Sequence, residues 1–197
     1  MLQTNQKERI ILGIDPGTAV MGYGLVKETG PKIELISLGV VKMDKIDDHM
    51  LKLQRIFEKT VALIDNYHPD CLAIEAPFYG KNIQVMLKLG RAQGVAMAAA
   101  LSRNVTITEY SPRKIKQSIT GNGNATKEQV AAMLQNLLSF KETPDFLDAT
   151  DGLAVAVCHS FQRNATAGKS GTKKSYSGWE TFVKDNTARV SGLKIKK

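Results

Sequence analysis

Four acidic residues stand at the ends of apolar segments, where folding could bring them together. They are Asp15, Glu75, Asp148 and Asp151. The first two end short apolar runs that are typical of buried strands, and a proline follows each within two residues. Asp-Pro-Gly at 15–17 is also an ordinary tight-turn sequence, so this acid alone would not indicate a site. Because the pattern recurs, the sequence suggests that the acids meet.

The spacing of Asp148 and Asp151 predicts that both project from one face of a helix, with about 5 to 6 Å between their Cβ atoms. Like charges repel at that distance. The helix dipole favours acids near a helix N-terminus, which accounts for Asp145 and in part for Asp148. Asp151 precedes an apolar stretch that must be buried, and a bound divalent cation would explain its position. Carboxylates from two strand ends and one helix would form an all-oxygen Mg²⁺ or Mn²⁺ site.

The hydrophobic pattern predicts an α/β protein with a mixed five-stranded sheet covered by helices. The expected strands are Ile10–Asp15, Met21–Lys27, Lys32–Met43, Cys71–Glu75 and Val105–Thr108. The first three are separated by short turns, which favours an antiparallel meander. The expected helices cover 47–67 with acids in the first turn, 82–102, a segment starting at 111–112, 126–140 and 145–161. The small residues of 82–102 would let that helix lie close to the sheet.

Positive charge is concentrated in two parts of this 197-residue chain, whose net charge is +8. Residues 81–127 contain eight Lys or Arg and one acid, and residues 163–197 contain nine Lys or Arg and two acids. This segregation suits a protein that presents a positive surface to a polyanion, although a solvated helix face is the alternative for any single lysine. We expect residues 1–162 to form the folded domain and 163–197 to form a basic, disordered tail.

Three features favour a cytoplasmic protein that does not associate with membranes. Residues 1–9 lack the apolar core of a secretory signal. No apolar stretch is long enough to span a bilayer. Cys71 and Cys158 lie in apolar runs without metal-ligand spacing, so they are expected to be reduced core thiols.

Several motifs that are weak singly become specific when they occur together and in order. They are Gly13-Ile-Asp-Pro-Gly-Thr with Gly22-Tyr-Gly, Ala73-Ile-Glu, Lys81-Asn, Leu87-Lys-Leu-Gly-Arg-Ala-Gln-Gly-Val-Ala and Asp148-Ala-Thr-Asp-Gly-Leu-Ala. In these motifs the chain resembles the RuvC family of Holliday-junction resolvases over residues 10–160. The resemblance implies an RNase H-like fold, a homodimer, and Mg²⁺-dependent cleavage of four-way DNA junctions by paired symmetric nicks in recombination and repair. It also makes the branch-migration proteins RuvA and RuvB candidate partners.

The resemblance further implies which residues act. The catalytic and metal-binding residues would be Asp15, Glu75, Asp148 and Asp151, with Mn²⁺ able to replace Mg²⁺. Two metal ions about 3.5 to 4 Å apart could activate a water and stabilise the leaving oxygen of a phosphodiester. Phe78, Lys116 and Lys127 match DNA-contacting residues of the family. Lys81, Lys88 and Arg91 are further DNA-binding candidates because of their charge, and a solvated surface is the alternative for each of them. Phe78 would stack on bases, and the basic residues would neutralise phosphates.

Two other functions remain open at this point. Asp-Pro-Gly-Thr after a strand also resembles the phosphate hairpin of actin-like phosphotransferases, although the chain is short for two lobes and lacks a second hairpin. A junction-binding module that has lost its chemistry is the second alternative, and the presence of all four acids argues against it.

Overall fold

The computed structural model describes residues 8–77, 82–140 and 146–167. Five strands form one sheet: β1 (Glu8–Asp15), β2 (Val20–Thr29), β3 (Lys32–Lys42), β4 (Cys71–Glu75) and β5 (Thr106–Tyr110). Their spatial order is β3-β2-β1-β4-β5. The first three strands pair antiparallel, whereas β4 runs parallel to both β1 and β5. The predicted meander and mixed sheet are therefore confirmed.

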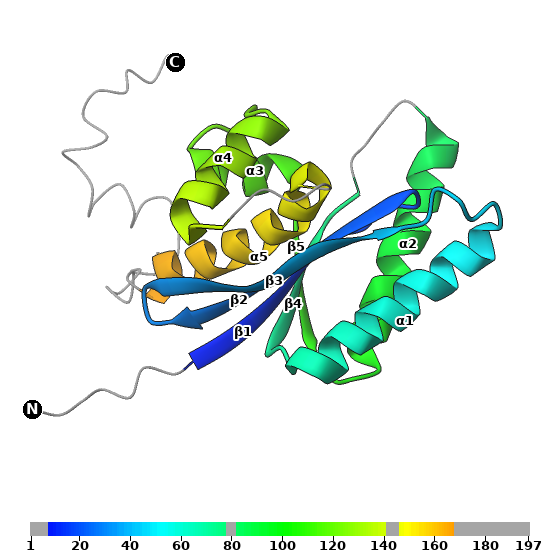
Figure 1. The fold of residues 1–197 in the computed structure, drawn as a ribbon, viewed down its shortest axis with the longest axis horizontal. Coiled ribbons are helices and arrows are strands. Elements are labelled where there is room, and N and C mark those ends of the chain that lie inside the picture. Colours follow the sequence, from blue (N-terminus) through cyan, green and yellow to red (C-terminus); the bar gives the residue numbers. More distant parts are fainter. Residues whose placement is uncertain (1–7, 78–81, 141–145, 168–197) are drawn as a thin grey trace, which may run out of the picture. The chain divides into compact units, whose positions relative to one another are not determined.

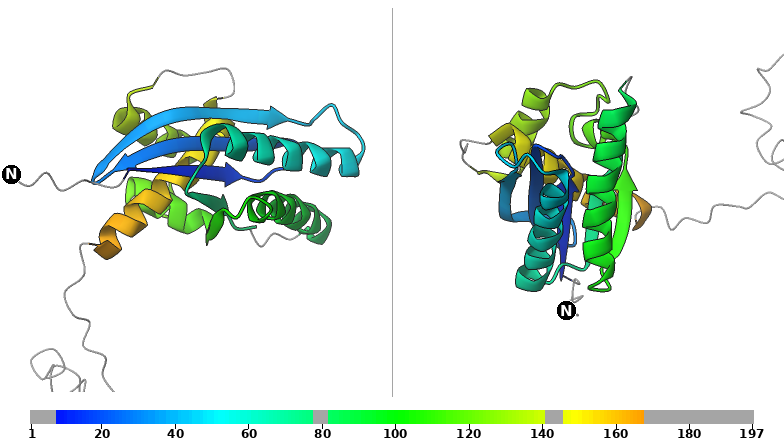
Figure 2. Two further views of the ribbon diagram at one scale, coloured as in Figure 1. Left: turned by 90° about the horizontal axis from the view of Figure 1, so that it is seen from below. Right: turned by 90° about the vertical axis from the view of Figure 1, so that its right-hand side faces the viewer.

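Helices cover both faces of the sheet (Figures 1 and 2). α1 (His49–Tyr67) and α2 (Ile83–Leu101) pack on one face, and α3 (Pro112–Thr120), α4 (Lys127–Leu138) and α5 (Phe146–Ala167) on the other. Strand residues alternate between the two cores. Ile11 and Ala73 face α3 to α5, while Leu12 and Leu72 face α1 and α2.

Some boundaries differ from the sequence-based prediction. β5 runs over Thr106–Tyr110, two residues further than expected, because its last residue pairs with Glu75 of β4. α1 has no acid in its first turn, since Asp48 is the N-cap and its side chain accepts from the Met50 amide. Thr126 and Gln129 form a capping box at the start of α4.

Glycines set the separation between α5 and the sheet. A Cβ added at Gly13 would overlap the carbonyl oxygen of Gly152, and one at Gly24 would overlap the main chain of Leu153. A Cβ at Gly152 would in turn lie 2.5 Å from the Cα of Tyr23. Because these positions carry no side chains, α5 lies with its backbone against β1 and β2.

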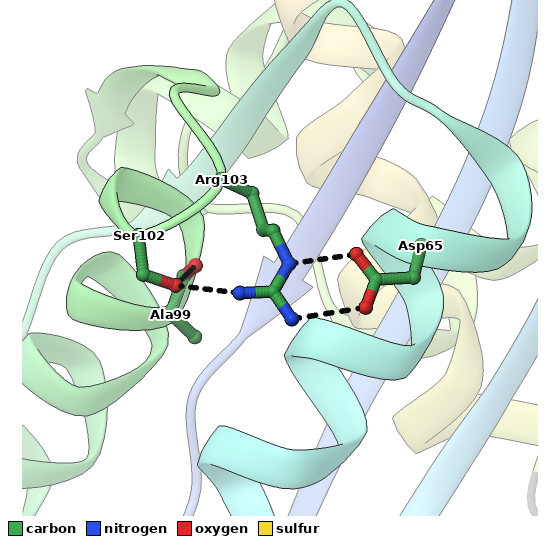
Figure 3. A network of polar contacts seen from close by, with 4 residues as sticks. All are labelled: Asp65, Ala99, Ser102 and Arg103. Carbon is green, nitrogen blue, oxygen red and sulfur yellow. Dashed lines mark hydrogen bonds and ion pairs between the residues drawn. The ribbon is translucent and has the colours of Figure 1, made fainter.

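α2 is attached to α1 by an ion pair near its C-terminal end. Arg103 donates from Nε and Nη2 to the two carboxylate oxygens of Asp65, at 2.8 and 3.1 Å. Its Nη1 also reaches the hydroxyl of Ser102, which donates to the Ala99 carbonyl (Figure 3). This bidentate ion pair holds the C-terminal end of α2 against α1.

The small residues of α2 divide between two environments. Ala92, Ala96 and Ala100 are fully buried against the sheet, as predicted. Gly90 and Gly94 instead have open space where a Cβ would lie, so the prediction that they pack on the sheet is wrong. The helical period explains this result, because positions 90 and 94 fall on the face opposite the alanines.

Both cysteines are free and buried, as expected. Burial raises the pKa of the Cys71 thiol to about 11 and also raises the pKa of Cys158. In the described part of the chain, no helix combines the length and apolar character needed to cross a membrane. The first residues of the predicted disordered tail, 163–167, belong instead to α5, which is longer than predicted. The rest of that tail, 168–197, lies outside the described residues.

Candidate active site

Three of the predicted acids line one cavity of about 350 Å³. Its lining consists of Asp15, Glu75, Pro112, Lys116, Lys127, Val130, Asp151 and Ala154. These residues come from β1, β4, α3, α4 and α5, so segments up to 139 positions apart in the chain meet there. The cavity combines carboxylates with two lysines.

The sheet places Asp15 and Glu75 together. Each is the last residue of its strand, and β1 and β4 run parallel with Ile14 opposite Ile74. The next residue on each strand is the acid, so both carboxylates stand at the same edge of the sheet. Asp15 is also paired with Gly22 of β2, beside the close approach of α5.

α5 contributes the other two acids at its N-terminal end. The side chain of Asp151 is 17% exposed and lines the cavity, whereas that of Asp148 is 50% exposed and does not. Asp148 still faces the site, because its Oδ1 lies 3.7 Å from Lys127 Nζ and its charge contributes to the raised pKa of Asp15. The expected helical pair is therefore present, with one member inside the cavity and one outside its lining.

Lys127 is the cation nearest the acids. Its Nζ lies 2.5 Å from Asp151 Oδ2, and its position as the first residue of α4 is fixed by the Thr126 capping box. Burial lowers the pKa of Lys127, but the hydrogen bond and charge of Asp151 outweigh this and raise it. Lys127 is thus held as an ammonium ion against the acids.

Burial and, after it, the charges of neighbouring carboxylates raise the pKa values of three acids of the site. Burial, followed by the charge of Asp151, raises the pKa of Asp15 to about 6. Burial, followed by the charge of Asp15, raises the pKa of Glu75 to about 8. Burial also raises the pKa of Asp151 despite its bond to Lys127. A site of this kind holds protons at neutral pH unless a cation neutralises it.

The donor set fits a hard divalent cation, because it consists of carboxylate oxygens gathered in one polar cavity. Among the described residues, no three acidic, His or Cys side chains yet lie close enough together to ligate one ion. In this arrangement the ammonium of Lys127 neutralises Asp151. Binding of a metal would therefore require the carboxylates to draw together and Lys127 to share or release Asp151.

The predicted DNA-binding residues separate into three groups. Lys116 and Lys127 line the cavity. Lys88 and Arg91 are exposed on α2 and do not line it. Phe78 and Lys81 lie outside the described residues.

Sequence reasoning missed the contact that Gln93 makes at the site. The side chain of Gln93 is buried and donates from Nε2 to the backbone carbonyl of Glu75, at 3.3 Å. The sequence does contain a sign of this contact, because Gln93 is a polar residue on the buried face of α2 that includes Ala96 and Ala100.

The strand order and the carboxylates at the sheet edge define an α/β nuclease of RNase H-like fold. The chain belongs to the RuvC family, since the family model described as crossover junction endodeoxyribonuclease RuvC matches residues 11–159. Nucleases of this family depend on a metal ion.

Individual relatives agree with this assignment. A crossover junction endodeoxyribonuclease RuvC of Christiangramia forsetii is 60% identical over 185 residues, which cover 94% of each chain. The one from Bacteroides fragilis is 57% identical over 186 residues, covering 93% of this chain and 97% of the relative. The structure of Thermus thermophilus RuvC in complex with a Holliday junction substrate matches with a TM-score of 0.74 and 31% identity, covering 80% of this chain and 96% of that one.

Proposed function

We propose that this protein is a nuclease that resolves four-way DNA junctions by paired, symmetric, Mg²⁺-dependent nicks. The observation that carries the proposal is the meeting of Asp15, Glu75 and Asp151 in one cavity of a chain that belongs to the RuvC family. The solved relative bound to a Holliday junction supports the choice of substrate. Membership of this family also disfavours an actin-like phosphotransferase.

The metal-binding residues in this proposal are Asp15, Glu75, Asp148 and Asp151. A bound pair of Mg²⁺ ions would supply an activated water and stabilise the leaving oxygen, and Mn²⁺ would substitute because it accepts the same oxygen ligands. Asp15 would hold metal from the end of the central strand, with Glu75 of β4 and the acids of α5 beside it.

The lysines of the cavity would act on the DNA. Lys127 and Lys116 can neutralise the phosphate that approaches the acids, and an ammonium group at this place stabilises the charge that develops during hydrolysis. Following the family resemblance, water would attack the phosphorus and the P–O3′ bond would break, which leaves 3′-hydroxyl and 5′-phosphate ends. Phe78, Lys81, Lys88 and Arg91 are proposed to contact the DNA outside the cavity.

We further propose a homodimer that uses α2. Four-way junctions offer two equivalent strands, so two symmetric sites could make paired nicks. α2 supports this role with exposed apolar side chains at Ile83, Val85 and Leu87, which are 68%, 48% and 51% exposed. The open space at Gly90 and Gly94 would let a second helix approach closely.

Three further proposals rest on the sequence and the family. Residues 1–162 are the nuclease domain, and the basic segment 163–197 is an arm that binds DNA without sequence preference. The branch-migration proteins RuvA and RuvB are the proposed partners in the resolution of junctions. The two buried free cysteines fit a reducing compartment, and we propose the cytoplasm as the place of action.

The test is a Mg²⁺ titration of the purified protein on a synthetic four-way junction labelled in turn on each strand. Symmetric nicks that a ligase can seal would support the proposal. A shifted but uncut junction at every Mg²⁺ and Mn²⁺ concentration would identify a binding module instead. Linear duplex of the same sequence is the control, and equal cutting of both substrates would contradict junction selectivity.

A further inference from the structure

The side chain of Gln93 connects three elements beside the acids. It is 7% exposed, and its Nε2 lies 3.3 Å from the Glu75 carbonyl oxygen and 2.7 Å from Glu109 Oε2. An amide group has two N–H donors, and both are used here. One residue of α2 thus holds the end of β4 and a carboxylate of β5.

The hydrogen bond from Gln93 is one of two that hold the peptide group between Glu75 and Ala76. The peptide between Glu75 and Ala76 has its oxygen bound by Gln93, and its N–H donates to the Tyr110 carbonyl at 2.8 Å. Both polar atoms of this group are therefore satisfied, one by α2 and one by β5. A peptide held at both ends cannot rotate freely, so the main-chain geometry from which the Glu75 side chain departs is fixed.

We propose that Gln93 is a positioning residue, which holds the Glu75 carboxylate in the direction needed for metal binding by fixing the peptide that follows it. The inference rests on the proposed function, because it assumes that Glu75 is a metal ligand. Outer residues that orient ligands contribute to metal affinity even though they do not touch the ion. The same bond joins the acid to α2, the helix proposed to form the dimer interface.

The test measures Mn²⁺ binding to the metal-free protein by isothermal titration calorimetry. Gln93→Met keeps the length of the side chain and removes both donors, and we expect Mn²⁺ affinity to fall by about tenfold or more. Junction binding without metal should stay within about twofold, because no phosphate-binding group changes. A circular dichroism melt shows whether Gln93→Met folds. If it does not fold, Gln93→Ala provides the same test.

Two variants separate positioning from general destabilisation. Arg103→Gln breaks the Asp65 ion pair at the other end of α2 and should lower the melting temperature without changing Mn²⁺ affinity. Glu109→Gln removes the charge of the other partner of Gln93 but keeps an acceptor oxygen, so it should also leave Mn²⁺ affinity unchanged. Unchanged affinity in Gln93→Met and Gln93→Ala, or an equal loss in Glu109→Gln or Arg103→Gln, would overturn the proposal. Wild-type protein that binds Mn²⁺ but cuts no junction would contradict only the proposed function.

Discussion

Gly22 of β2 packs directly against the main chain of Asp148 on α5, so closely that a Cβ at position 22 would overlap the Asp148 carbonyl oxygen. The strand residue opposite Gly22 is Asp15. One glycine therefore sets the distance between two acids that are 133 positions apart in the sequence. The glycines at this contact are part of the site, although they carry no reactive group.

Gly22→Ala should push α5 away from the sheet and separate its acids from Asp15. We expect a loss of about 1–3 kcal/mol in unfolding free energy from overpacking, together with weaker Mn²⁺ binding and slower cleavage. Gly30→Ala is the matched control, because its positive φ of 59° also disfavours alanine but it lies in the turn at the other end of β2. Equal effects of both variants on Mn²⁺ binding would contradict this explanation.

Asp151→Asn should abolish junction cleavage and leave junction binding unchanged or slightly tighter. The substitution removes a proposed metal ligand and one negative charge near the DNA phosphate, while the amide keeps the size of the side chain. Nicking and gel-shift assays on the same labelled junction measure the two effects separately. Full cleavage activity in the variant would show that Asp151 is not a ligand.

Metal binding should release protons at pH 7. The pKa values of Asp15 and Glu75 are raised to about 6 and about 8, so Glu75 is mostly protonated at neutral pH and must lose its proton to bind a cation. Mn²⁺ added to weakly buffered protein at pH 7 should acidify the solution, and Glu75→Gln should reduce this release. Equal release at pH 7 and pH 9 would contradict the prediction.

The same pKa shifts predict how the stability of the metal-free protein depends on pH. In the unfolded chain both acids lose their protons near pH 4, whereas the folded protein keeps them to about pH 6 and pH 8. The folded state therefore binds more protons in this window, and stability falls as pH rises from 4 to 8. Melting temperatures at successive pH values measure the fall, and a double variant Asp15→Asn, Glu75→Gln should flatten it.

Lys116→Ala should slow cleavage and weaken the salt dependence of junction binding. Loss of one phosphate contact reduces the slope of log affinity against log salt by about 1. Lys116 lines the cavity, whereas the exposed Lys32 on β3 forms an ion pair with Glu34 and serves as the control. An unchanged slope in Lys116→Ala, measured by fluorescence anisotropy, would argue against a phosphate contact.

The sequence allowed prediction of the sheet and of three acids in the cavity, because both depend on local patterns. Apolar runs that end in Asp15 and Glu75 mark strand ends, and parallel pairing brings such ends to one edge. The partners of Lys127 and Gln93 could not be predicted, since each contact joins segments whose approach depends on helix packing. The open space beside Gly90 and Gly94 was also missed, because glycine content alone does not show which face of a helix meets the sheet.

The burial of Cys71 and Cys158 has a practical consequence for studying this protein. Both thiols are shielded from solvent and keep their protons at neutral pH, so maleimide reagents should react with them slowly. A single cysteine introduced on an exposed position of α2 would then be the preferred site of labelling in the otherwise native sequence. Fluorophores attached there could report subunit exchange or DNA engagement without prior removal of the natural cysteines.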